Sequence, residues 1–169
     1  MVYRIYVEKK AGLDNEAKAL LAELTTLLGI KALTGVRFFN RYDVENLDES
    51  LFLRTVSDVF SEPQLDVATR ELPETDGVVF ATEYLPGQFD QRADSAMQCI
   101  RLMAPESSPL VRTARVYVLE GELTEADVEK IKKYVINPVE CREASLNTVK
   151  TLQADYASRS KTIVNVGHL

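Results

Sequence analysis

The sequence offers few side chains that could carry out acid–base or nucleophilic chemistry. Its only histidine is His168, the second-to-last of 169 residues. A Ser–His–Asp or Cys–His centre would have to be built around a chain end, where order is poorest. A zinc site would need further ligands at short spacing, and the sequence has no such cluster of histidine, cysteine and carboxylate residues. These residues predict neither a catalytic triad nor a metal site.

The remaining candidates for chemistry are two cysteines and many carboxylates. Cys99 falls among apolar residues of an expected helix, so we expect a buried free thiol, and we expect Cys141 in a loop. No Walker-type phosphate loop, no GxGxxG and no GxSxG motif occurs. The 26 acidic residues are expected to form a solvated surface. We therefore predict no catalytic residue and no bound cofactor in this chain.

The charge balance limits the possible partners. With 20 basic and 26 acidic residues the net charge is −6, and the sequence pI is about 4.9. This balance argues against nucleic acid, because affinity for phosphates depends on clustered Lys and Arg. No apolar run reaches the roughly 20 residues that span a bilayer, and the start of the sequence lacks a secretion signal. We expect a cytoplasmic protein with no membrane partner.

The elements that must position any site alternate between strands and helices. Alternating apolar residues predict strands, and apolar residues at helical spacing predict amphipathic helices. Asp14 and Asp90 are candidate N-caps, Gly29 suits a helix C-terminus, and Thr124 opens a capping box. In the first half we expect a strand at 3–7, a helix at 17–28, a strand at 36–44, a short helix after 48 and an extended segment at 65–72. In the second half we expect a strand at 78–85, a helix at 90–103, a strand at 111–120 and a helix from about 124 to 136.

The two halves also match residue by residue. Val36–Arg37 corresponds to Val111–Arg112, and residues 42–45 correspond to 117–120. One inserted residue later, Leu47–Glu49 corresponds to Leu123–Glu125. Such a long period indicates two copies of one supersecondary unit. We predict an α+β fold in which duplicated ferredoxin-like halves form a pseudo-dimer, with antiparallel sheets and helices packed outside. The halves are assigned to residues 1–72 and 77–143, and residues 144–169 to a linker leading out of the domain.

Four segments carry a resemblance to a known family. Together they resemble the N-terminus of the large, single-chain form of phosphoribosylformylglycinamidine synthase, closest to the versions of clostridia and their relatives. The resemblance covers nearly the whole chain and weakens after Glu143. Its most specific part is the run of Leu, Pro, Gly, Gln, Phe, Asp, Gln and Arg at residues 85–92. The four segments are Tyr3–Lys10, Val59–Asp66, Glu83–Ala96 and Lys133–Glu140.

The resemblance implies a part of a larger enzyme. The full enzyme converts formylglycinamide ribonucleotide, ATP and glutamine to the amidine, ADP, phosphate and glutamate in purine biosynthesis. In that family the N-terminal domain is similar to a dimer of the separate small subunit, which implies small-subunit-like halves here. The ATP- and magnesium-binding synthetase domain and the glutaminase domain lie further along the chain. They would be the partners of this chain, which would help to shelter the ammonia that passes between them.

Within the most specific segment, we predict that Gln88, Phe89, Asp90, Gln91 and Arg92 form a domain interface. Arginine at a helix N-terminus opposes the helix dipole, and arginine and aromatic residues are enriched at interface cores. Two other interpretations of the segment remain open: a tight turn that starts a helix, and direct contact with substrate. The isolated chain is expected to lack activity and, because partner surfaces would be exposed, to self-associate weakly.

A second function remains open at this stage. A free-standing tandem regulatory module that binds a small molecule such as an amino acid would have similar length, acidity and duplication. Such a module needs a suitable loop between its first strand and first helix, and Ala11–Asp14 is a weak match. A small enzyme that uses carboxylates alone is a third possibility.

Overall fold

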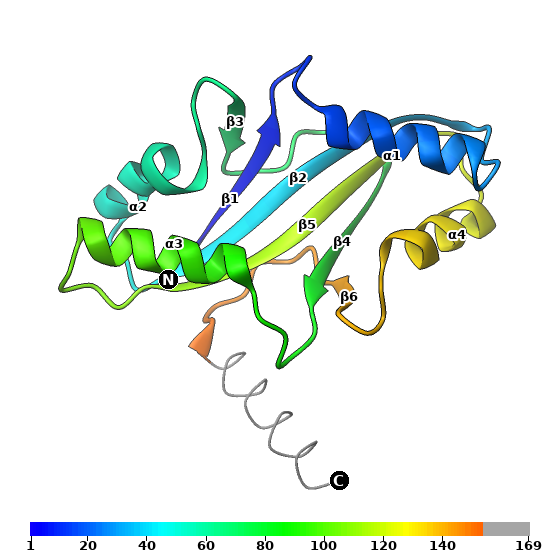
Figure 1. The fold of residues 1–169 in the computed structure, drawn as a ribbon. Coiled ribbons are helices and arrows are strands. Elements are labelled where there is room, and N and C mark those ends of the chain that lie inside the picture. The colour runs from blue at the N-terminus through cyan, green and yellow to red at the C-terminus, as the bar shows by residue number, and fades with distance from the viewer. Residues whose placement is uncertain (154–169) are drawn as a thin grey trace, which may run out of the picture.

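The computed structural model describes residues 1–153 as an α+β fold built on one six-stranded antiparallel sheet (Figure 1). The strand order is β3-β1-β2-β5-β4-β6. The strands are β1 (Val2–Lys9), β2 (Leu33–Glu45), β3 (Asp66–Thr69), β4 (Val78–Tyr84), β5 (Leu110–Gly121) and β6 (Cys141–Ala144). The helices are α1 (Asn15–Thr26), α2 (Glu49–Thr55), α3 (Gln91–Met103) and α4 (Glu125–Val135), with a π-helical turn η1 (Val56–Phe60) after α2.

This arrangement confirms the predicted α+β class and corrects the predicted sheets. The sequence predicted more than one sheet, whereas the described residues form one continuous sheet. The reason is that β2 pairs with β5 along almost its whole length, from Leu33 opposite Gly121 to Glu45 opposite Leu110. This pairing joins two strands that would otherwise be exposed sheet edges.

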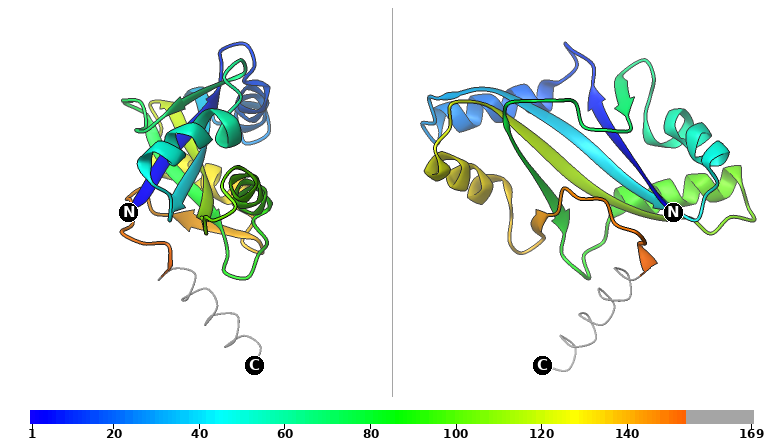
Figure 2. Two further views of the ribbon diagram at one scale, coloured as in Figure 1. Left: turned by 90° about the vertical axis from the view of Figure 1, so that its left-hand side faces the viewer. Right: turned by 180° about the vertical axis from the view of Figure 1, so that it is seen from behind.

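The helices pack on one face of the sheet (Figures 1 and 2). At one end, α2 and α3 bury Phe52 and Ile100 against Ile5 and Val44. At the other end, α1 and α4 bury Leu24 and Ile131 against Phe80 and Leu119. Each apolar cluster thus takes one helix from each half of the chain. No helix in the part of the chain that the structure describes is long and apolar enough to cross a bilayer.

The opposite face of the sheet carries a third apolar cluster that includes no helical residue. Its buried members are Tyr6, Phe39, Ala81, Val116, Val118 and Ala144. Leu72 packs against them from the segment that connects β3 to β4, and this segment crosses in front of the sheet in the right-hand view of Figure 2. The segment after β6, Ser145–Gln153, also returns to the sheet, where Leu152 is completely buried.

The pairing register repeats between the two halves. Every pair of β1 with β2 or β3, except Val2 with Glu45, has a counterpart 75 residues later in both strands. For example, Ile5 with Tyr42 corresponds to Phe80 with Tyr117, and Tyr6 with Thr69 corresponds to Ala81 with Ala144. β1 and β4 are therefore the middle strands of two three-stranded units, β3-β1-β2 and β5-β4-β6, that share one register.

Two of the three expected helix N-caps form side-chain bonds. Asp90 and Thr124 each accept a bond from the third residue of the helix that follows, and Thr124 completes its capping box with Asp127. Asp48 caps α2 in the same way. Asp14 occupies the N-cap position of α1 but accepts no capping bond. One burial prediction was wrong: Cys99 is exposed, because Ala93, Ala96 and Ile100 form the buried stripe of α3.

Two glycines, one after a helix and one at the end of a strand, have positive φ angles that an alanine would adopt only with strain. Gly121 has φ of +127°, and an added Cβ would clash with the carbonyl oxygen of Ala32. Gly29 has φ of +68° with nothing within 4 Å of an added Cβ. Gly29→Ala should lower the free energy of unfolding by about 1 kcal/mol, and Gly121→Ala by about 3 kcal/mol or more. Urea denaturation of both variants measures the difference, and equal losses would contradict the described close approach.

Candidate functional site

The predicted interface segment forms a turn between β4 and α3. Leu85 N donates to Glu140 O at 2.8 Å and Gln88 N donates to Leu85 O at 3.0 Å, and Gly87 supplies the positive φ that this turn needs. Gln88, Phe89 and Gln91 are exposed, and Phe89 is 68% exposed. The turn is therefore fixed at its base and presents an aromatic side chain at its tip.

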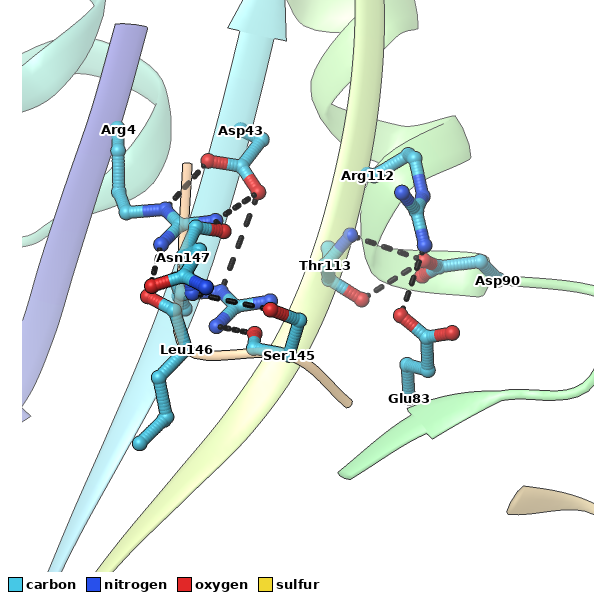
Figure 3. Close-up of polar contacts among 10 residues, drawn as sticks. Arg4, Asp43, Glu83, Asp90, Arg112, Thr113, Ser145, Leu146 and Asn147 are labelled. Carbon is cyan, nitrogen blue, oxygen red and sulfur yellow. Dashed lines mark hydrogen bonds and ion pairs between the residues drawn. The ribbon is translucent and has the colours of Figure 1, made fainter. Parts of the chain in front are cut away.

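Asp90 fixes this turn to the sheet. Its Oδ1 accepts from Ala93 N at 3.0 Å, which caps α3. Its Oδ2 accepts from the hydroxyl of Thr113 at 2.7 Å and from Thr113 N at 3.2 Å, both on β5 (Figure 3). Asp90 is therefore committed to bonds inside the domain. Among the five predicted interface residues it supports the turn.

Arg92 crosses from α3 to the first half of the chain. Its Nη1 donates to Asn40 Oδ1 on β2. The arginine that opposes the dipole at the start of α3 thus has a partner inside the domain. Gln88, Phe89 and Gln91 remain the part of the predicted segment that faces solvent.

Two clefts occupy corresponding places on the helical face. The first lies between the start of α1 and η1, has a volume of about 440 Å³ and is named here the α1 cleft. The second lies between the start of α3 and the end of α4, has a volume of about 260 Å³ and is named the α3 cleft. Residues lining the α1 cleft include Val7, Lys9, Asp14, Phe38, Tyr42 and Asp66. Residues lining the α3 cleft include Thr82, Tyr84, Arg92, Thr113, Arg115 and Tyr117.

The region between the clefts is tied together by polar contacts across the halves. Arg115 on β5 donates to Glu16 Oε1 on α1 at 3.4 Å, as Arg92 on α3 donates to Asn40 on β2. The Arg115 guanidinium also lies 4.8 Å from the centre of the Phe38 ring, a cation–π contact. These contacts join the N-terminal ends of α1 and α3 to the strands of the opposite half.

The opposite face of the sheet holds a network of buried charges (Figure 3). Arg4 donates to both oxygens of Asp43, at 2.7 and 2.9 Å, and to the carbonyls of Leu146 and Asn147. Arg41 donates to Ser145 O at 2.8 Å. Burial and the nearby Arg4 lower the pKa of Arg41. These arginines therefore hold the segment after β6 on the sheet. The sequence analysis did not single out Arg4 or Arg41, although both lie on strands whose residues alternate between the two faces of the sheet.

Potential catalytic and metal-binding groups are few among residues 1–153. No group of three His, Cys, Asp or Glu residues in that range could hold a metal ion. Burial, and then the charge of Glu140, raise the pKa of Cys141, which disfavours the thiolate. Cys141 begins β6, although the sequence predicted a loop there. His168 lies outside the described residues.

Comparison with models of known protein families finds no match for this chain, and comparison with curated proteins finds none either.

The two corresponding N-cap residues should differ in their effect on stability. Asp90→Ala removes three hydrogen bonds and should lower the free energy of unfolding by about 1–3 kcal/mol. Asp14→Ala removes no capping bond, so its effect should be clearly smaller. Thermal unfolding of the two variants measures this, and an equal loss in both would show that the caps are equivalent.

The tyrosines of the two clefts should make stability depend on alkaline pH. Burial raises the pKa of Tyr42 and of Tyr117, although Arg92 and Arg115 oppose the shift. In the unfolded chain both phenols ionise at about pH 10, so the folded state binds more protons above that pH. The stability from these groups is complete below about pH 10 and declines above it, by up to about 1.4 kcal/mol per pH unit and group. Alkaline denaturation of a Tyr42→Phe, Tyr117→Phe double variant should show a shallower decline, and an unchanged slope would contradict the assignment.

Proposed function

We propose that this chain is the N-terminal assembly domain of a large, single-chain phosphoribosylformylglycinamidine synthase. Its role would be to hold the synthetase and glutaminase domains together so that ammonia passes between their sites without loss to water. ATP and magnesium would bind in the partner domains, and the chain would have no activity alone. The enzyme of this proposal would act in the cytoplasm.

The repeated pairing register carries this proposal. The resemblance implies a domain built like a dimer of small subunits, and such a domain needs two equivalent halves. A constant shift of 75 residues relates the pairs of β1 with β2 and of β1 with β3 to those of β4 with β5 and of β4 with β6. An ion pair follows the same shift: Arg37 bonds Glu8 at 2.7 Å, and Arg112 bonds Glu83 at 2.8 Å. These repeats support a duplicated pseudo-dimer in which the halves share one sheet.

The turn before α3 supports an assembly role. Phe89 is exposed at the tip of a turn that Asp90 fixes to β5. A rigid aromatic side chain loses little entropy when a partner covers it, which is typical of interface anchors. We therefore assign Gln88, Phe89 and Gln91 to the partner contact, and Asp90 and Arg92 to its support.

The size of the native polypeptide tests the proposal directly. An antibody raised against this chain should detect a band far above 19.0 kDa in an extract of the source cells. A band at 19.0 kDa would contradict the proposal and favour a free-standing protein.

Substitution of the exposed aromatic should weaken association without unfolding the domain. Phe89→Ser should reduce co-purification of the chain with the separately expressed synthetase and glutaminase domains by at least about tenfold in affinity. Leu27→Ser is the matched control, because Leu27 is 72% exposed at the C-cap of α1, outside the turn. Equal retention of both variants would exclude Phe89 as an anchor. The pure chain should turn over neither glutamine nor ATP.

A tandem regulatory module that binds an amino acid is the second candidate. The observation that favours it is the position of the turn after β1, where Leu13 and Asp14 line the larger cleft. An amino acid that raises the melting temperature of the chain would support this function. No response to any amino acid, with tight association to the synthetase, would favour assembly.

A further inference from the structure

Each of the two clefts lies beside the N-cap aspartate of a helix, and the two aspartates differ in their hydrogen bonds. At the α3 cleft, Asp90 is saturated by Ala93 N and by the amide and hydroxyl of Thr113. At the α1 cleft, the position equivalent to Thr113 in the register repeat is Phe38, which has no side-chain donor. Asp14 makes no capping bond, and its Oδ1 instead pairs with Lys18 Nζ at 3.5 Å. The carboxylate that accepts three hydrogen bonds inside the second half is thus paired, in the first half, with one exposed lysine side chain.

The two clefts also differ in the charged residues that line them. The lining of the α3 cleft is balanced, with Arg92 and Arg115 against Glu83 and Glu140. The lining of the α1 cleft contains six carboxylates and two cations. Four of these carboxylates are in ion pairs: Asp66 with Lys9 at 2.9 Å, Glu8 with Arg37 at 2.7 Å, Glu16 with Arg115 at 3.4 Å and Asp14 with Lys18 at 3.5 Å. The six carboxylates are those of Glu8, Asp14, Glu16, Asp58, Glu62 and Asp66.

The pKa of Asp14 favours a charged carboxylate at the cleft. It is lowered by a hydrogen bond from the backbone at Asp14 itself and, in addition, by the nearby Lys18 charge. The lining of the cleft also includes the apolar and aromatic side chains of Val7, Val36, Tyr42 and Phe60. A volume of about 440 Å³ lies in the range of small-molecule sites.

We propose that the α1 cleft binds a small organic cation, in which an ammonium or guanidinium group is attached to an apolar or aromatic body. The cationic group would pair with Asp14, with Asp58 and Glu62 nearby, and the body would pack on Tyr42 and Phe60. The site is distinct from the turn at Phe89 and does not depend on the assembly role. The excess of carboxylates also disfavours a ligand that carries its own carboxylate, so a zwitterionic amino acid should bind less well than the corresponding amine.

The test is a titration of the full 169-residue chain followed by two-dimensional amide NMR. Phenethylamine is the probe, with 2-phenylethanol as its neutral analogue and phenylalanine as its zwitterionic analogue. Agmatine tests the guanidinium group. Phenethylamine should give saturable shifts at residues 12–17 and 58–66, and its affinity should exceed that of both analogues by at least about tenfold. Added salt should weaken it.

Matched variants locate the site. Asp14→Asn should raise the Kd for phenethylamine by about tenfold or more. Asp90→Asn is the control, because Asp90 is the N-cap residue of the helix beside the other cleft, and it should leave that Kd unchanged. Asp58→Asn gives a second, exposed position should Asp14→Asn alter the fold, and it should also raise the Kd.

Four results would overturn the proposal. They are saturable binding by neither phenethylamine nor agmatine, equal affinity for phenethylamine and 2-phenylethanol, unchanged affinity in both the Asp14 and the Asp58 variant, and shifts centred on the α3 cleft. A failure of this test leaves the size of the native polypeptide and the Phe89 experiment unaffected, so the two proposals stand or fall separately.

Discussion

The antiparallel pairing of β2 with β5 is the contact on which the rest of the structure depends. It makes one sheet of two three-stranded units, and it brings α3 beside α2 and α4 beside α1. Phe52 and Ile100 then share one apolar cluster, and Leu24 and Ile131 share the other. Neither half closes its own core, so the two predicted halves, residues 1–72 and 77–143, depend on each other for burial.

Local signals in the sequence were sufficient for the elements and insufficient for their assembly. Strand alternation predicted β1, β2 and β5, and short capping motifs predicted the starts of α3 and α4. Strand order depends on pairing between residues as distant as Val36 and Leu119, which no local pattern encodes. β6 was missed because four residues, most of them solvent-accessible, show no useful alternation. Cys99 was placed inside because apolar neighbours outweighed its position on the helix.

The candidate site was partly predictable for the same reason. The turn at residues 85–92 is contiguous, so its specific sequence drew attention to Phe89 and Arg92 before the structure was known. What the sequence could not show is that Arg92 bonds to Asn40, 52 positions earlier in the chain. The α1 cleft was harder to predict from the sequence than the turn. Asp14, Phe38, Asp58 and Asp66 come from four separate elements or loops, and only packing of α1 and η1 on the sheet brings them together.

The differences between the halves follow from what each position must do. The Glu–Arg pairs at Glu8 with Arg37 and Glu83 with Arg112 join neighbouring strands in both halves, and both keep the same residue types. Residues at the clefts differ in type between the halves. Phe38 corresponds to Thr113 at the 75-residue shift, and Asn40 corresponds to Arg115. In the second half these changes add bonds that close the site. In the first half Phe38 offers Asp14 no side-chain donor, and Asp14 makes no capping bond to α1 either. α1 therefore begins without the stabilising bond that a capping side chain gives, and the carboxylates of the α1 cleft lie beside this uncapped end.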